Sequence, residues 1–256
     1  MGRRCFHFKY NKIMIKKRIQ KIIGVFGYEL LRKKGTPRKF CEKKSYSQCG
    51  EDLIIEYVFN LRNITKPTYI DIGANDPFYL SNTALFYQKG CTGINIEANP
   101  NLIKNFQIDR PLDINLSIGI GAEVGKLEFF IMNDPTLSSF SKSECDNYVK
   151  TGKYHIIDTL QVEIATLNSI IDKYCNGIFP DFMSLDAEGM DFDILKSINY
   201  ETSAPKIICV EAAEYSPIGA GERRDELINF LVEKGYYEYA NTNLNAILVK
   251  KDFWFI

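Results

Sequence analysis

The chain has 256 residues, of which 45% are hydrophobic and 25% are charged. A chain of this size can bury enough surface to form one globular domain without disulfides or metals to hold it together. The seven cysteines are scattered and never spaced C-x-x-C, which argues against a disulfide framework or structural zinc and favours a reducing, cytoplasmic setting. With only His7 and His155 present, catalysis built on several histidines is excluded, so carboxylates must perform any acid–base or metal chemistry.

The net charge of zero conceals a strong asymmetry along the chain. Residues 1–44 contain 15 of the 32 Lys and Arg residues but only two of the 32 acids, which gives this part a net charge of +13. Residues 45–256 therefore carry a net charge of −13. Such a distribution is typical of a basic extension on an acidic domain, and we predict two parts, 1–44 and 45–256.

The basic extension contains apolar residues at the spacing of one helix face, namely Ile15, Ile19, Ile22, Phe26 and Leu30. This amphipathic helix is too short and too interrupted to span a bilayer, and it lacks the cleavage pattern of a signal peptide. Three roles stay open for residues 1–34. They are packing on the acidic domain or on a second copy in a homo-oligomer, peripheral contact with an anionic membrane, and binding of a polyanion.

Beyond the extension, strand-like and helix-like segments alternate. Strands are predicted at 68–72, 93–97, 113–118, 126–132, 160–165, 181–186 and 206–212. Helices are predicted at 53–61, 82–90, 99–106, 166–174, 190–198 and 223–235, with a hairpin over 237–250. This alternation predicts an α/β fold, in which a mostly parallel sheet is covered on both faces and ends in a C-terminal antiparallel hairpin.

Between the predicted strands 126–132 and 160–165 lies a polar segment, residues 133–155, which we call the cover segment. The sequence predicts a long loop here. Because a loop of this length is more than a simple connection, the cover segment is a candidate cover for a substrate. It contains His155, for which the alternatives are a solvated loop histidine and a residue that binds the acceptor or serves as a base.

The segment TYIDIGANDP, residues 68–77, resembles a strand that runs into a nucleotide-binding loop. Its only glycine is Gly73, so it lacks the G-x-G-x-x-G pattern that lets a pyrophosphate approach a helix. Asn75 tolerates the left-handed conformation and can replace a second glycine. An acid at the end of the next strand, Glu97, stands where nucleotide-binding α/β folds bond the ribose hydroxyls. A ligand without a pyrophosphate, such as S-adenosylmethionine, suits this loop better than a dinucleotide does.

Several segments together resemble the FkbM family of S-adenosylmethionine-dependent methyltransferases. They are SYSQCGEDLII (45–55), YIDIGANDPFYLSNT (69–83), GINIEANP (93–100), SLDAEGMDFDIL (184–195) and IICVEA (207–212). The resemblance covers about 45–250 and implies a class I methyltransferase fold that transfers a methyl group to a hydroxyl oxygen. The version with GED and DIGANDP is similar to members found with bacterial capsule and lipopolysaccharide genes. Ala98 and Asn168 depart from the pattern expected for the family, which has Pro and Asp at these places.

The expected cofactor-binding residues are Asp71, Gly73, Ala74, Asn75, Asp76, Asn82, Glu97, Ala98, Ser117 and Asp186. The expected catalytic residues are Asp186, Glu188, Glu211 and His155. Asp186, Glu188 and Glu211 lie at or just past predicted strand ends and could also hold Mg²⁺ or Mn²⁺, which prefer oxygen ligands. Asp186 as a helix cap, Glu211 as a buried ion-pair partner and a structural Glu188 are the alternatives. Glu51 and Asp52 either cap a helix or close the cofactor pocket.

The function expected from these residues and from the resemblance is O-methylation of a sugar hydroxyl in bacterial surface polysaccharide synthesis. The acceptor is either a nucleotide-activated sugar or a lipid-linked glycan. Methylation of another small-molecule hydroxyl is the nearest alternative. A nucleic-acid partner is not expected, because the acidic domain would repel phosphates. An NAD-dependent oxidoreductase and a cofactor-binding scaffold protein are the remaining alternatives.

Overall fold

The computed structural model describes residues 42–187, 189–213 and 221–255. The chain forms two compact units, residues 1–42 and 43–256, and the fold described below is that of the second unit. The amphipathic helix predicted over residues 15–30 and the predicted site residue Glu188 lie outside the described residues. In the described part of the chain, we find no helix with the length and apolar character needed to cross a membrane.

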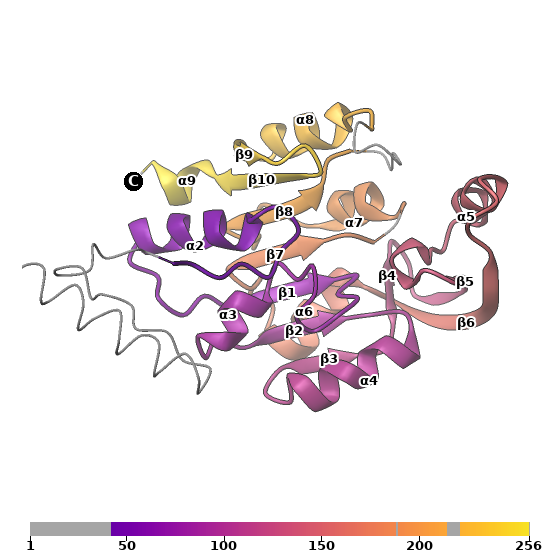
Figure 1. Ribbon diagram of the computed structural model, residues 1–256. Coiled ribbons are helices and arrows are strands. Elements are labelled where there is room, and N and C mark those ends of the chain that lie inside the picture. The colour runs from indigo at the N-terminus through magenta and orange to yellow at the C-terminus, as the bar shows by residue number, and fades with distance from the viewer. Residues whose placement is uncertain (1–41, 188, 214–220, 256) are drawn as a thin grey trace, which may run out of the picture. The chain divides into compact units, whose positions relative to one another are not determined.

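The main sheet has seven strands in the order β3-β2-β1-β7-β8-β10-β9 (Figure 1). Their bounds are Tyr69–Ile72 (β1), Gly93–Ile96 (β2), Ile114–Leu116 (β3), Phe182–Leu185 (β7), Ile207–Glu211 (β8), Tyr236–Asn241 (β9) and Asn245–Lys250 (β10). Neighbours from β3 to β8 pair in parallel, and β10 is antiparallel to both β8 and β9. The mostly parallel sheet and its C-terminal hairpin confirm the α/β fold predicted from the sequence.

Helices cover both faces of this sheet, because successive strand residues point to opposite sides. Ile70 and Ile72 join the core that contains α6 (Leu167–Cys175), α7 (Asp191–Ser197) and α8 (Asp225–Glu233). Tyr69 faces the opposite core, which contains α2 (Glu51–Leu61) and α3 (Ala84–Gln88). Every residue of β1 is buried, as expected for a parallel strand covered on both sides.

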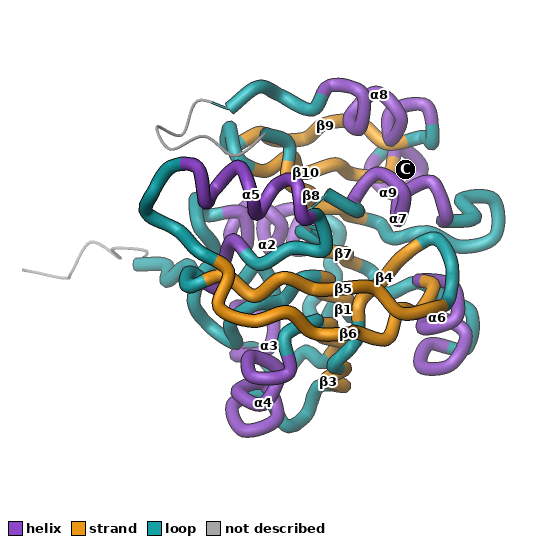
Figure 2. Tube along the Cα trace, turned by 90° about the vertical axis from the view of Figure 1, so that its right-hand side faces the viewer, coloured by secondary structure: helices purple, strands orange, loops and turns teal. Residues whose placement is uncertain are grey.

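A second sheet has the order β4-β6-β5, with bounds Gly119–Gly121 (β4), Gly125–Met132 (β5) and Ile156–Thr166 (β6). Figure 1 shows this sheet to one side of the main sheet, and in the view of Figure 2 β5 and β6 lie in front of the main-sheet strands. The sequence did not predict a separate sheet. It predicted a single sheet for all strands, including 126–132 and 160–165, and it left residues 119–121, which form β4, between two predicted strands.

The cover segment is not the loop that the sequence predicted. It contains a short 3-10 helix, η1 (Pro135–Leu137), and the helix α5 (Lys142–Lys150). Helix α5 begins where the Ser141 side chain accepts a hydrogen bond from the main-chain N–H of Glu144. Cys145 and Tyr148 then pack on the side chains of β5. A helix as short as α5 needs few apolar residues to pack on a sheet. The polar composition of the cover segment therefore gave no sign of this helix.

Candidate functional site

One cavity of about 780 Å³ lies where the carboxyl ends of the parallel strands face the second sheet. Residues at the ends of β1, β2, β7 and β8 line one side of it. Residues of the cover segment, from Pro135 to Thr151, line another. This is the edge of an open parallel sheet at which ligands bind, so the cavity is the candidate site.

Gly73 brings the ends of β1 and β7 into contact. Its φ of 76° lies in the left-handed region, and a Cβ atom at this position would come within 1.8 Å of the main-chain oxygen of Asp186. Asn75 also adopts the left-handed conformation, with a φ of 53°, as the sequence indicates. The single glycine of the loop is therefore required by the close approach of two strands, and Asn75 makes the second turn without one.

Glu97 ties this loop to the end of β2. Its two carboxylate oxygens accept hydrogen bonds from the main-chain N–H groups of Asn75, at 2.9 Å, and Asn99, at 2.7 Å. Burial raises the pKa of the Glu97 carboxyl, and these N–H groups act in the opposite direction. Each oxygen keeps a second lone pair for a ligand, so Glu97 can shape the loop and still accept the two hydroxyls of a ribose.

A cluster of charged side chains lies at the ends of β7 and β8. The Arg224 guanidinium contacts Asp191 Oδ2 at 2.9 Å and Glu211 Oε2 at 3.3 Å. The main-chain N–H of Arg224 donates to the main-chain oxygen of Ala212, the residue that follows β8. The arginine therefore lies beside the end of this strand in the fold. Asp191, the first residue of α7, also accepts a hydrogen bond of 2.7 Å from the N–H of Ala187. These contacts close the turn that follows Asp186.

Asp186 lies against this cluster and is accessible to solvent within the cavity lining. Desolvation by the surrounding protein and then the negative charges of Glu211 and Asp191 raise its pKa well above the usual range of an aspartate. Desolvation also raises the pKa of Glu211 to about 7, although Arg224 lowers it. Of the described residues, none donates a hydrogen bond to the Asp186 carboxylate. The cavity thus presents a carboxylate that accepts no hydrogen bond from a described residue and whose affinity for a proton is raised.

The described carboxylates do not form a metal centre. In the described part of the chain, no three His, Cys, Asp or Glu side chains are grouped closely enough to hold a metal ion. The positive charge beside Glu211 and Asp191 is the guanidinium of Arg224. The residues present therefore fit an arginine-compensated acid cluster, and the metal site predicted from Asp186, Glu188 and Glu211 stays a prediction because Glu188 is not described.

The remaining predicted residues lie in different places. Ala74, Asn82 and Ala98 line the cavity with Asp71, Gly73, Asn75 and Glu97, whereas Asp76, Ser117 and His155 do not. Asp76 Oδ1 instead accepts the N–H groups of Phe78 and Tyr79 and so fixes the turn after the loop. His155 is exposed where β6 begins, and its main-chain N–H donates to Asn133. Its catalytic role stays a prediction.

Glu51 and Asp52 are fully buried at the start of α2 but do not line the cavity. Glu51 Oε1 accepts hydrogen bonds from Thr242, at 2.7 Å, and Asn245, at 3.0 Å. It therefore holds the turn between β9 and β10, next to the cavity residue Asn245. Asp52 accepts hydrogen bonds from residues 45–47 that precede the helix. Both acids organise the wall behind the cavity.

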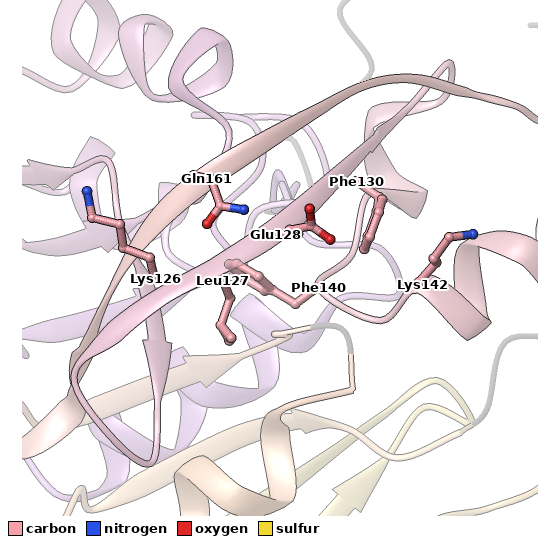
Figure 3. Close-up of a pocket in the computed structure, with 7 residues that line it drawn as sticks. All are labelled: Lys126, Leu127, Glu128, Phe130, Phe140, Lys142 and Gln161. Carbon is pink, nitrogen blue, oxygen red and sulfur yellow. The ribbon is translucent and has the colours of Figure 1, made fainter.

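A second hollow of about 430 Å³ runs along β5, and Phe140 lines both it and the main cavity (Figure 3). Glu128 and Gln161 face each other across the β5–β6 pair in this hollow. Its two lysines are both paired, Lys126 with Glu163 at 2.7 Å and Lys142 with Asp146 at 2.9 Å. With each lysine balanced by an acid, the hollow is not a strongly basic surface.

Asp191, Arg224 and Glu144 are site residues that the sequence did not reveal. Asp191 follows LDAEGM as an acid in the first turn of a helix, a position that is also common for purely structural reasons. Arg224 immediately precedes α8. Glu144 belongs to the cover segment, where it accepts a hydrogen bond of 2.9 Å from Ser139 and lines the cavity. Of these three residues, only Asp191 could have been suspected from the sequence, because it lies close to a predicted strand end.

Solved structures that are similar to the chain include several methyltransferases. A "Methyltransferase FkbM" from Methylobacillus flagellatus KT shares 14% identity with a TM-score of 0.40, over 72% of this chain but only 43% of that one. A "putative caffeoyl-CoA O-methyltransferase" from Staphylococcus aureus shares 14% identity over 81% of this chain and 85% of that one, with a TM-score of 0.41.

A third structure is the 1,6-didemethyltoxoflavin-N1-methyltransferase of Burkholderia thailandensis with bound S-adenosylhomocysteine, at 8% identity. It covers 79% of this chain and 77% of that one, with a TM-score of 0.39. Identities and TM-scores this low say nothing about what this chain methylates. No curated protein matches the chain significantly.

The family comparison is more specific, because it concerns the segments that build the cavity. The model of the "Methyltransferase FkbM domain" matches residues 71–237, which is more than half of the chain. The match begins at Asp71 and includes Glu97, Asp186, Glu211 and Arg224. On this match, the chain belongs to the Methyltransferase FkbM domain family.

Proposed function

We propose that the chain is an S-adenosylmethionine-dependent O-methyltransferase that acts on a sugar hydroxyl in the synthesis of a bacterial surface polysaccharide. The observation that supports this most strongly is a single cavity with two different carboxylate environments. Glu97 is bound by main-chain N–H groups, whereas Asp186 is free of hydrogen bonds from described residues and has a raised pKa. The first arrangement suits binding of a methyl donor, and the second suits removal of a proton.

The residues at the β1 and β2 ends fit S-adenosylmethionine. The cavity volume of about 780 Å³ is in the usual range for sites that bind ligands of this size. Glu97 can accept the ribose hydroxyls, and Asp71 provides a negative charge for the donor's positive groups. When bound, the donor supplies a methyl group on a positively charged sulfur. The loop after β1 has no cradle of glycines for a pyrophosphate, which disfavours NAD.

Asp186 is the proposed general base. A hydroxyl is a poor nucleophile at neutral pH, so it must lose its proton as its oxygen bonds to the methyl carbon and the carbon–sulfur bond breaks. With the donor bound, the Asp186 carboxylate would take this proton, and the donor would supply the methyl group and become neutral S-adenosylhomocysteine. Glu211, whose pKa is about 7, shares the negative charge of the cluster. Arg224 stabilises that charge while the base is ionised.

Polar side chains of the cover segment support a sugar as the acceptor. Thr136, Ser138 and Asn147 line the cavity and provide hydroxyl and amide groups that can bond to sugar hydroxyls. The same groups could hold another small-molecule alcohol, which is the second candidate. A nucleic-acid substrate is disfavoured, because residues 45–256 carry a net charge of −13 and phosphates would be repelled.

The test is a screen of nucleotide-activated sugars and lipid-linked glycans with S-adenosylmethionine, read by mass spectrometry. We expect one acceptor to gain the mass of one methyl group in place of one hydrogen, with formation of S-adenosylhomocysteine. Transfer to a nitrogen, or transfer only to non-sugar alcohols, would contradict the sugar assignment. If the protein binds NAD but not S-adenosylhomocysteine, the whole proposal is wrong.

For the basic extension, we propose that residues 1–34 attach the enzyme to the cytoplasmic face of a membrane that carries anionic lipid. The support is the net charge of +13 over residues 1–44 together with the apolar helix face. Cosedimentation with anionic liposomes should require residues 1–34 and should weaken in high salt. Binding that persists without residues 1–34 would refute this role and leave oligomer contacts or polyanion binding as the alternatives.

A further inference from the structure

Asp71 belongs to a polar network that includes the hydroxyl groups of Thr83 and Ser184. The Thr83 hydroxyl donates to Asp71 Oδ2 at 2.6 Å. Ser184 is the register partner of Asp71 on β7, and its hydroxyl lowers the pKa of the Asp71 carboxyl. Asp71 and Ser184 both line the cavity, whereas Thr83 lies behind it and is fully buried.

The oxygen of each of these two hydroxyl groups accepts a hydrogen bond from a nitrogen that can only donate. Arg110 Nη1 donates to Thr83 Oγ1 at 3.0 Å, and Asn82 Nδ2 donates to Ser184 Oγ at 3.2 Å. Since a guanidinium has no acceptor, the Thr83 oxygen must accept and its hydrogen remains for Asp71. The same logic applies to Ser184, because the amide nitrogen of Asn82 is a donor. The network therefore leaves the hydroxyl hydrogens of Thr83 and Ser184 available to one carboxylate, and Thr83 donates its hydrogen to Asp71 Oδ2.

Arg110 is fixed from every side. It is fully buried, and its Nε and Nη2 groups donate to Asp113, at 2.9 Å, and to the Tyr69 hydroxyl, at 3.0 Å. Its Nη1 group also donates to the main-chain oxygen of Pro77, at 3.3 Å. Burial raises the pKa of Asp71, and the Thr83 hydroxyl and the Arg110 charge oppose that rise. A buried arginine thus links the loop after β1 to the charge on Asp71.

We propose that Thr83 and Ser184 are positioning residues of the cofactor site. They hold the Asp71 carboxylate as the acceptor for the ammonium group at the amino-acid end of the methyl donor. The inference rests on the proposed binding of S-adenosylmethionine. Glu97 is the acid at the ribose end, and its oxygens are engaged with the loop. Asp71 lies beside Ser184 of β7, the strand that leads directly to Asp186, and this places it toward the reacting end.

The test compares two ligands that differ only at the amino-acid end. S-adenosylhomocysteine has the ammonium group, whereas 5′-methylthioadenosine keeps the adenosine and the thioether but lacks it. Thr83→Val should raise the Kd of S-adenosylhomocysteine about tenfold, the effect of losing one hydrogen bond to a charged group. The Kd of 5′-methylthioadenosine should stay as in the wild type. Thr83→Ser, which restores the hydroxyl, should bind both ligands like the wild type.

Thr68→Val is the matched control. Thr68 immediately precedes β1, and its hydroxyl bonds to Asp181 at the opposite end of the sheet. This variant should bind both ligands normally. Ser184→Ala tests the second hydroxyl and should repeat the selective loss, and it decides the question if Thr83→Val does not fold in a thermal melt. Equal losses for both ligands, or no loss, would overturn the inference. Failure of the wild type to bind S-adenosylhomocysteine would instead refute the proposed cofactor.

Discussion

The proposed cofactor end and the proposed acceptor end of the cavity are built in different ways. The cofactor end is local in the sequence, since the β1 strand, its loop and Glu97 lie within residues 69–99, and main-chain hydrogen bonds join them. The acceptor end brings together Glu144, Asp186, Glu211 and Arg224 from distant parts of the chain. Its contacts are between charged side chains. One half of the site is thus fixed by main-chain contacts within a short stretch of sequence. The other half forms only when charged side chains from distant segments come together in the folded chain.

The largest expected effect separates the two proposed ends by removing the proposed base, Asp186. Asp186→Asn keeps the shape of the side chain but cannot accept the acceptor's proton. We expect kcat to fall by about 10²- to 10⁴-fold, while the Kd of S-adenosylhomocysteine stays near the wild-type value. Asp193→Asn is the control, because Asp193 is exposed on the neighbouring helix and pairs with Lys196. Retained turnover in Asp186→Asn would show that another group is the base.

The second prediction tests the point where the two ends meet. Gly73→Ala would place a Cβ atom against the main chain of Asp186 at a positive φ. Overpacking and backbone strain together should lower the free energy of unfolding by about 3 kcal/mol in urea denaturation. Gly235→Ala has a similar φ but open space around it, so it should cost about 1 kcal/mol. Equal losses in the two variants would mean that the strands do not approach this closely.

The third prediction concerns the electrostatics of the acceptor end. Glu211 titrates at about 7 in the folded protein and at 4.5 when unperturbed. A carboxyl that binds its proton more tightly when folded stabilises the protein fully below its unfolded pKa, and this stabilisation is lost as the pH rises through the folded pKa. The free energy of unfolding of the wild type should therefore fall as the pH rises through this window. In Glu211→Gln the fall should be smaller.

Urea denaturation at several pH values measures this effect. Glu233→Gln is the control, since Glu233 is an exposed glutamate at the end of α8. We expect this control to follow the wild-type pH dependence. If Glu211→Gln follows it as well, the pKa of Glu211 is not raised in the folded protein.

The rate of methyl transfer should also increase with pH through about 7 if the cluster acts as a base.

The same contrast explains what could be predicted from the sequence. The β1 loop and Glu97 were identified because strand ends, a glycine and the spacing of one strand–helix–strand unit are local signals. Arg224 and Glu144 were missed because nothing near them in the sequence indicates which strand end they will reach. Asp76 was assigned to the cofactor from its place in the motif, yet its side chain closes a turn. Motifs give positions along the chain, whereas side-chain partners depend on the packed structure.

The second sheet was missed for a related reason. Strand β6 alternates apolar and polar residues and β5 ends in an apolar run, but neither pattern says which sheet a strand joins. At Gly119 of β4, side-chain atoms of Ile164 and Phe140 lie 2.6 Å from where a Cβ atom would be, so a larger residue would force these side chains to move. In the sequence the glycines of β4 resemble a turn. Long-range packing, rather than local propensity, makes this segment a strand.

The most direct test of the account is calorimetric titration of S-adenosylhomocysteine into three proteins: the wild type, Glu97→Gln and Asp186→Asn. Glu97→Gln replaces one carboxylate oxygen, which accepts a main-chain N–H, by an NH2 group that cannot accept one. We therefore predict a Kd for S-adenosylhomocysteine about 30-fold higher than in the wild type. The wild type and Asp186→Asn should bind alike, because Asp186 belongs to the acceptor end. Equal losses in both variants, or normal binding by Glu97→Gln, would contradict the division of the cavity into a cofactor end and an acceptor end.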